Sequence, residues 1–476
     1  MSIISIWFMG FVLCVLLLLA ASHQFLPAEK RTAADRLILL CASFAFMIYA
    51  DWRFALVLAM MSTVTWLCAP RKVLAGAGIA FALICLAYFK YTNFFISSFL
   101  IAFGRTAPDV LDILLPLGIS FYTFSAISYI VDVQRCKTAP RSLPQVALYL
   151  SFFPKVTSGP IQRSEDFFRQ TDKPCEISLQ AISEGAQIYI FGLFKKIVLA
   201  DRLSVFVNQV FNTPRAFSSG TVLLAVLAYA LQIYFDFSGY SDMSIGAARV
   251  LGIRMPRNFN LPYLSHNVTE FWKRWHISLS SWLQDYLYIA LGGSRKGESR
   301  AYVNLTIVML IGGLWHGPSY NYIIWGLMHG SALTVHKLYM KKTGSARKSS
   351  SLPSRIASVL GTFAFVCLTW IFFRASTLNQ ALTILSCLLP GRKGVSHPYL
   401  WLLFALVVYL VCASAAALRT RERALPKRRQ NTSWVQGFYP SADLSTFKGL
   451  FFFFVLCGLI LALAHTGGSP FIYGAY

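Results

Sequence analysis

The sequence predicts an all-α polytopic membrane protein, with about eleven or twelve transmembrane helices and additional re-entrant or interfacial helices. Of the 476 residues, 56% are hydrophobic and only 13% are charged, whereas about a quarter of the residues in a soluble domain are charged. Apolar runs recur along the chain, and short basic loops separate them. Because no long polar stretch remains to form a soluble domain, we expect one membrane domain over residues 1–476.

The chain is strongly basic, with 43 Lys and Arg residues against 19 Asp and Glu residues. The basic residues lie in short loops between apolar runs, as expected for loops that stay on the cytoplasmic side of a bilayer. This pattern favours a lipid bilayer as the partner of the basic residues and predicts no nucleic-acid partner.

The first apolar run, residues 3–21, is long enough to span a bilayer. It lacks a basic leader and a small-residue cleavage site, so we expect a retained helix with its N-terminus outside. Further spans are expected at residues 37–50, 52–69 and 73–88, whereas residues 91–103 are too short to assign.

Two stretches of the middle region contain helix breakers inside apolar sequence. Residues 112–135 contain Pro116 and Gly118, and residues 149–163 contain Pro154 and Pro160. Such residues suit close helix packing or a broken helix beside a polar cavity. Lys155 lies among them and is therefore expected to face a cavity or an interface.

Acidic residues follow in and beside two apolar helices. Residues 188–201 place Asp201 near Lys195 and Lys196, and the span at residues 221–237 is followed by Asp242. We expect Asp236 and Asp242 to pair with arginines or helix N-termini rather than to act in catalysis.

Residues 267–288 have the composition of one interfacial or re-entrant amphipathic helix. The segment contains five tryptophan and tyrosine side chains typical of a membrane interface, together with Lys273, Arg274 and His276. A basic loop follows at residues 292–300.

Residues 302–315 predict a helix that rises about 20 Å before it reaches His316. In a hydrocarbon core roughly 30 Å thick, His316 would lie beyond the midplane. Gly317 and Pro318 end the helix there. On one continuous helix His329 would face another direction, but this break permits the two histidines to converge.

The C-terminal part predicts a basic cytoplasmic segment at residues 337–355 and spans at 357–373, 399–418 and 449–464. Residues 465–476 would then lie outside the membrane.

Standard catalytic motifs are absent. The chain has no G-x-S-x-G elbow, Walker A loop or H-E-x-x-H pair, and its ten cysteines show neither metal-ligand nor disulfide spacing. No metal is therefore expected. What remains is histidine inside the membrane, a group that can act as a general base near neutral pH.

Several ordered motifs resemble the membrane-bound O-acyltransferase (MBOAT) family, most of all its bacterial alginate and cellulose O-acetylation branch. They lie in a motif-bearing core at residues 112–336 and read LPLGISFYTFSAISYIVDV, FFPKVTSGPIQR, FGLFKKIVLAD, FDFSGYSDMSIG, LPYLSHNVTEFWKRWHISLSSWLQDYLYIALGG and GGLWHGPSYNYIIWGLMHG.

The resemblance implies helices around a central tunnel and an acyl thioester donor, acetyl-CoA, that enters from the cytoplasm, with no bound cofactor. His316 matches the family's tunnel histidine and His276 the histidine of its F-W-x-R-W-H motif, so both are predicted to be catalytic. Asp201 matches an acidic position as a supporting residue. His329 is as consistent with packing as with chemistry.

Acetyl transfer requires a base and donors that hold the developing oxyanion. His316 is the expected base. His276 is expected to polarise the carbonyl or, with Lys273 and Arg274, to orient the donor phosphates.

The tail SPFIYGAY resembles the end of this branch, where a tyrosine matching Tyr473 is a candidate acyl carrier. Gly474 and Ala475 depart from the branch pattern. An aromatic membrane anchor explains Tyr473 equally well.

The function expected from this resemblance is acetyl transfer across a bacterial inner membrane for O-acetylation of an exported exopolysaccharide, alginate or cellulose. A periplasmic SGNH-type acetyltransferase is the expected partner, and both termini are expected in the periplasm. The alternatives are D-alanyl or peptidoglycan O-acyl transfer, or a transporter without enzymatic activity.

Overall fold

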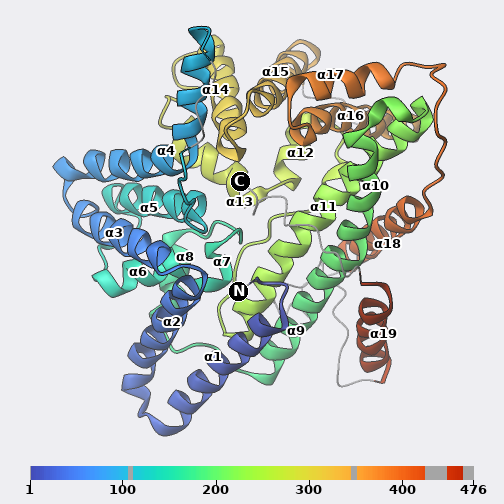
Figure 1. Cartoon of the computed structure of the whole chain (residues 1–476). Helices are drawn as coiled ribbons and strands as arrows, with labels where there is room; N and C mark the ends of the chain where they lie inside the picture. Colours follow the sequence, from blue (N-terminus) through green and yellow to red (C-terminus); the bar gives the residue numbers. More distant parts are fainter. Residues whose placement is uncertain (1, 106–110, 345–350, 424–446, 465–476) are drawn as a thin grey trace. The chain divides into compact units, whose positions relative to one another are not determined.

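The computed structural model describes residues 2–105, 111–344, 351–423 and 447–464, and helices dominate these residues (Figure 1). Apart from an isolated bridge between Phe217 and Val395, the described residues form no β-structure. The all-α fold expected from the sequence is therefore confirmed.

Five helices among the described residues are long and apolar enough to span a membrane: α1 (Ile6–Phe25), α2 (Ala28–Ala50), α4 (Lys72–Ala102), α11 (Ser219–Val250) and α16 (Leu352–Arg374). Three shorter apolar helical segments are Trp52–Cys68, which is α3, and Leu400–Ser414 and Gly449–Leu463, which belong to α18 and α19. The chain is thus a multi-pass membrane protein. The total of eleven or twelve spans stays a prediction.

The chain forms two compact units, which are described separately. Residues 1–189 with 240–256 form the first unit, and residues 190–239 with 257–475 form the second. Helices α9 (Leu179–Leu193) and α11 each contribute residues to both units. The single membrane domain expected from the sequence stays a prediction.

In the first unit, the helix α4 is longer than the span expected from the sequence. The sequence predicts a span at residues 73–88 and assigns nothing to residues 91–103, whereas the 31-residue α4 runs without interruption from the first range into the second. The polar segment at the junction contains no glycine or proline, and the Thr92 hydroxyl donates a hydrogen bond of 2.7 Å to the Tyr88 carbonyl. A polar segment without a breaker therefore continues the helix.

Gly118, one of the helix breakers in the sequence, immediately precedes a helix. Gly118 adopts φ +75° directly before α5 (Ile119–Gln134). A Cβ atom at Gly118 would lie 2.0 Å from the Val156 carbonyl oxygen, so only glycine fits both this backbone and this contact. The short helices α6 (Leu143–Ser151), α7 (Phe153–Val156) and α8 (Ser164–Thr171) follow.

Lys155 on α7 lines a small cavity, as the sequence predicted, and its side chain is buried. Its ammonium lies 4.0 Å from the ring centroid of Tyr149 and 4.6 Å from that of Phe167. Two aromatic faces thus surround the charge and replace part of its hydration.

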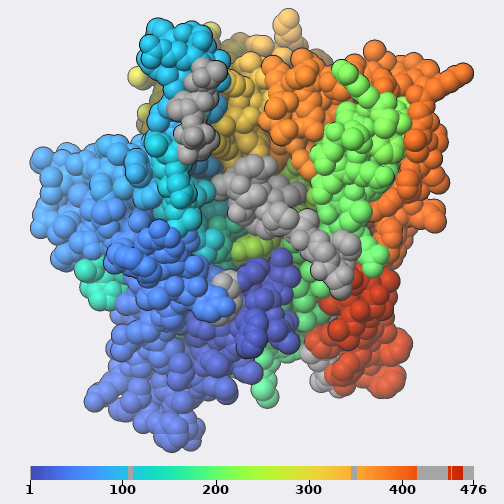
Figure 2. Space-filling model, viewed as in Figure 1, coloured from blue at the N-terminus to red at the C-terminus, as the bar shows by residue number. Residues whose placement is uncertain are grey.

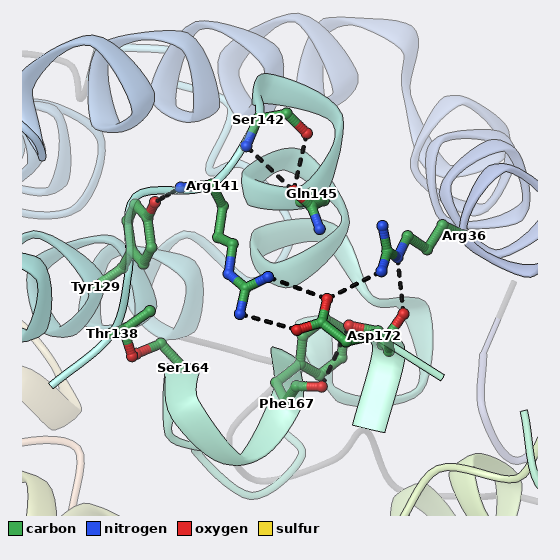
Figure 3. Close-up of polar contacts among 10 residues, drawn as sticks. Arg36, Tyr129, Thr138, Arg141, Ser142, Gln145, Ser164, Phe167 and Asp172 are labelled. Carbon is green, nitrogen blue, oxygen red and sulfur yellow. Dashed lines mark hydrogen bonds and ion pairs between the residues drawn. The ribbon is translucent and has the colours of Figure 1, made fainter. Parts of the chain in front are cut away.

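Asp172 ties distant parts of the first unit together (Figure 3). Its carboxylate accepts a hydrogen bond from Arg36 at 2.9 Å. It accepts another from Arg141, whose shortest nitrogen–oxygen distance is also 2.9 Å. Arg36 also donates to the Thr171 carbonyl at 2.7 Å. A single carboxylate therefore links α2 to the α5–α6 connection and the end of α8.

The second unit begins with the end of α9 and a π-helical turn, η1 (Phe194–Ala200). It continues with α10 (Asp201–Asn212), η2 (Pro214–Ala216), η3 (Pro262–Leu264), α12 (Val268–Arg274), α13 (Ile277–Trp282), η4 (Leu283–Tyr288), α14 (Glu298–His316), α15 (Tyr320–Thr343), α17 (Leu378–Cys387), α18 (Leu400–Arg423) and α19 (Phe447–Leu463). Helices α14 and α15 pack closely together, and α15 packs on α16. In the space-filling view, α10 in green lies beside α17 in orange (Figure 2), where Gln380 donates to the Phe211 carbonyl at 2.8 Å.

Residues 267–288 do not form the single amphipathic helix expected from the sequence. They form α12, α13 and the π-helical turn η4, and the break lies at His276, which adopts φ +42°. A right-handed helix cannot continue through a residue in the left-handed region. Composition alone did not contain this signal.

Candidate functional site

His276 occupies a strained backbone position between two short helices. It is the residue before α13, and its φ of +42° and ψ of +54° place it in the left-handed region. For a residue other than glycine this conformation costs about 1–2 kcal/mol. Trp275 before it is buried, as is the His276 side chain itself, so packing on both sides holds the turn in place.

The imidazole of His276 is only 1% exposed, and neither ring nitrogen has a hydrogen-bond partner among the described residues. Its ring packs edge-on against Phe237, with centroids 4.7 Å apart. A buried polar group without a partner costs about 1–3 kcal/mol. The free donor and acceptor are consistent with a ligand that supplies the missing partner.

His316 is the last residue of α14, where the sequence predicted the helix to end. Its side chain is buried, at 4% exposure, within an aromatic cage. The centroids of Trp315, Trp325 and Phe373 lie 4.9, 5.3 and 5.1 Å from that of the imidazole. The cage excludes water from the ring, and a water-poor site strengthens electrostatic interactions with a bound substrate.

His329 lies on α15 and is completely buried. Its Nδ1 accepts a hydrogen bond from the Trp272 indole N–H at 3.3 Å, and its Nε2 lies 3.0 Å from the Thr369 hydroxyl. Since both nitrogens have partners, the geometry favours packing over chemistry for this residue.

Two tryptophans connect the three histidines. The Trp315 ring lies 6.1 Å from His276 and 4.9 Å from His316 between centroids. The Trp325 ring lies 5.3 Å from His316 and 4.8 Å from His329. The structure therefore brings the three histidines into one aromatic cluster in the second unit, in which tryptophan and histidine alternate.

Asp201 belongs to a separate buried ion cluster. Lys196 lies 2.7 Å from the Asp201 carboxylate and 2.6 Å from that of Asp236, and all three side chains are at most 3% exposed. Asp236 therefore has an ionic partner, as predicted, although the partner is a lysine and not an arginine. The cluster joins the π-helical turn η1 and the start of α10 to α11, which suits a supporting role for Asp201.

The two expected donor-binding cations differ in their surroundings. Arg274 is half-buried and pairs with Glu270 at 2.6 Å on the same helix. Lys273 is exposed and lines a cavity of about 470 Å³. Tyr473, the candidate acyl carrier, lies outside the described residues.

Sequence reasoning missed the residues that hold the histidines. Trp325 precedes His329 by four residues, so the two share one helix face, and this spacing is a readable signal. Phe373 and Thr369 come from α16, at least 40 residues after the histidines they contact. No local pattern indicates such partners.

Comparisons of the chain with a family model and with individual known proteins point to the same family. Residues 80–379 match the model of the membrane-bound O-acyltransferase family. A probable alginate O-acetylase of Pseudomonas putida is 41% identical over 72% of this chain and 73% of its own length. A peptidoglycan O-acetyltransferase of Helicobacter pylori is 39% identical over 65% and 63%, respectively. A teichoic acid D-alanyltransferase of Bacillus subtilis is 28% identical over 56% and 70%.

Proposed function

Because the chain belongs to the membrane-bound O-acyltransferase family and is an acyltransferase, we propose that it transfers acetyl groups from acetyl-CoA for the O-acetylation of an exported exopolysaccharide. The donor is used from the cytoplasmic side of a bacterial inner membrane, and both termini lie in the periplasm. The identity of 41% to a probable alginate O-acetylase supports acetyl as the group and alginate as the first acceptor to test. Cellulose is the second polymer to test.

The observation that carries the assignment to this site is the buried imidazole of His276, whose two nitrogens have no partner among the described residues, beside the caged His316. In the proposed reaction His316 accepts the proton of the acceptor hydroxyl. The hydroxyl oxygen then attacks the thioester carbonyl. His276 donates an N–H to the carbonyl oxygen as negative charge develops there.

When the intermediate collapses, the carbon–sulfur bond breaks, the new carbon–oxygen ester remains, and the thiolate of coenzyme A takes up the proton from His316. The acceptor in this step is a hydroxyl of the polymer or of a carrier. Tyr473 is the proposed carrier in this chain, and a periplasmic SGNH-type acetyltransferase is the proposed partner that completes transfer to the polymer.

The assignment is tested with purified full-length protein in lipid nanodiscs and radiolabelled acetyl-CoA. We expect His316→Ala and His276→Gln to lower the rate of thioester consumption at least 100-fold, the smallest loss usual for a general acid or base. His397→Gln is the matched control, because His397 is exposed and outside the cluster. Wild-type rates in His316→Ala at normal protein levels would contradict the catalytic assignment.

The side of donor entry is tested with sealed membrane vesicles, which acetyl-CoA does not cross. Inverted vesicles should consume added acetyl-CoA, and right-side-out vesicles should not. Consumption by right-side-out vesicles alone would place the donor site on the opposite face.

A second acceptor, peptidoglycan, is favoured by the 39% identity to a peptidoglycan O-acetyltransferase. Cells fed with labelled acetate distinguish the two, because the label appears in ester linkage either on the exopolysaccharide or on the cell wall. Labelled D-alanine tests the D-alanyl alternative in the same way. A protein that consumes no thioester but moves polysaccharide would support the transporter alternative.

A further inference from the structure

A cavity of about 470 Å³ in the second unit is lined by α12, α13 and η4 on one side and by α14 and α15 on the other. This volume falls within the roughly 300–1,000 Å³ of sites that hold small molecules. The histidines of the cluster are not among its lining residues. Of the lining, only Lys273 was expected from the sequence to contact a ligand, the phosphates of the donor, and the proposed mechanism does not use it.

The lining of the cavity combines buried apolar residues with exposed basic ones. Leu283, Val308 and Met309 line it and are buried, whereas Lys273 and Lys337 line it and are exposed. No carboxylate belongs to the described lining. The complementary ligand is therefore an amphiphile with a long apolar part and an anionic head.

Three hydroxyl groups of the lining already have hydrogen-bond partners within the protein. The Thr269 hydroxyl lies 2.9 Å from Nδ1 of His336, and Ser280 and Ser281 donate to backbone carbonyls of their own segment at 3.3 and 3.0 Å. The wall thus offers mainly alkyl contact. An alkyl chain suits it better than an amide-rich arm, which would need free polar partners.

The helices around the cavity also expose apolar side chains on their outer surfaces. Val303 and Ile311 of α14 are 48% and 42% exposed, and Leu327 and Val335 of α15 are 47% and 63% exposed. In a multi-pass membrane protein such surfaces suit contact with lipid.

We propose that this cavity binds one anionic phospholipid. Its acyl chain lies on Leu283, Val308 and Met309, and its phosphate lies between Lys273 and Lys337. Arg274 takes no part, because it is paired with Glu270. The inference does not depend on the proposed acetyl transfer, since it concerns residues outside the histidine cluster.

The test is native mass spectrometry of the purified full-length protein after equilibration with equal concentrations of phosphatidylglycerol and phosphatidylcholine. The wild type should retain one phosphatidylglycerol in preference to phosphatidylcholine. The double variant Lys273→Gln/Lys337→Gln should weaken phosphatidylglycerol binding roughly 30-fold, since each lysine near an anionic lipid contributes about a fivefold preference. The variant Lys341→Gln/Lys342→Gln removes the same charge outside the lining and should bind as the wild type does.

A second variant, Val308→Trp, fills the apolar interior and should reduce the binding of both lipids, with retention of the monodisperse gel-filtration peak as the check on folding. Equal retention of the two lipids by the wild type would overturn the proposal, as would equal losses in the two lysine double variants. Stoichiometric displacement of phosphatidylglycerol by acetyl-CoA would also overturn it and would assign the cavity to the thioester donor. Thioester consumption is measured separately, so a failed lipid assay leaves the proposed function untouched.

Discussion

The indole N–H of Trp272 donates a hydrogen bond of 3.3 Å to Nδ1 of His329. On the other side of the ring, Nε2 of His329 lies 3.0 Å from the Thr369 hydroxyl, which itself donates to the Val366 carbonyl at 2.8 Å. The imidazole proton is therefore assigned to Nε2, with Thr369 as its acceptor. His329 joins α12, α15 and α16 and has no free lone pair for base catalysis.

We expect His329→Leu to lower stability by about 1–3 kcal/mol, because it leaves the part-buried Trp272 N–H without its acceptor. Thermal unfolding in detergent, followed by tryptophan fluorescence, measures the effect. The double variant Trp272→Phe/His329→Leu removes both partners and should lose less than the sum of the single variants. Unchanged unfolding with abolished thioester consumption would instead indicate a chemical role for His329.

The contrast between His329 and His276 shows what the sequence can predict about this site. Both histidines lie in recognisable motifs, and the end of α14 at His316 follows from Gly317 and Pro318. The partners of His329 on α16 and the left-handed backbone of His276 depend on tertiary packing. Sequence pattern therefore identified the histidines, and only the structure distinguished the one with satisfied nitrogens from the one without.

His276→Gly separates backbone strain from chemistry at the junction of α12 and α13. Glycine adopts φ +42° without steric cost, so we expect His276→Gly to fold at least as well as His276→Ala and to be about 1 kcal/mol more stable than that variant. Both variants should lose thioester consumption at least 100-fold. The measurement combines thermal unfolding with radiolabelled acetyl-CoA turnover.

Added imidazole provides the control for His276→Gly. The variant leaves space where the ring was, and free imidazole should restore part of the lost rate in His276→Gly. Full activity of His276→Gly without imidazole would show that the residue serves only the turn.

The buried ion cluster of Lys196, Asp201 and Asp236 predicts a large stability effect. Removing one partner of a buried ion pair typically costs about 3–5 kcal/mol, because a charge stays buried without compensation. We therefore expect Lys196→Met to reduce the yield of folded protein strongly. Asp201→Asn should have a smaller effect, since Lys196 keeps Asp236 at 2.6 Å. Fluorescence-detected gel filtration at increasing temperature compares the stability of the two variants. A larger loss in Asp201→Asn than in Lys196→Met would contradict the assigned roles.

The helices of the first unit show the same division between local and distant signals. The break at Gly118 was predictable from residue type. The continuity of α4 through its polar segment was not, because a polar segment in an apolar run indicates a loop and a helix equally well until the partners of its side chains are known. Local sequence thus predicts where helices must stop more reliably than where they continue.

The close contact between α14 and α15 yields a prediction at Gly326. A Cβ atom there would lie 2.4 Å from the Met309 carbonyl oxygen, so Gly326→Ala must separate the two helices and move the neighbouring Trp325 away from His316. We expect a loss of about 1–3 kcal/mol in stability, as for other overpacked positions, and a lower rate of thioester consumption. Gly361→Ala on α16 is the matched control, because its Cβ would have no atom within 4 Å. Alanine at position 361 should leave activity unchanged and raise stability by up to about 1 kcal/mol through its greater helix propensity. Equal thermal unfolding curves for Gly326→Ala and Gly361→Ala would show that α14 and α15 can separate without cost.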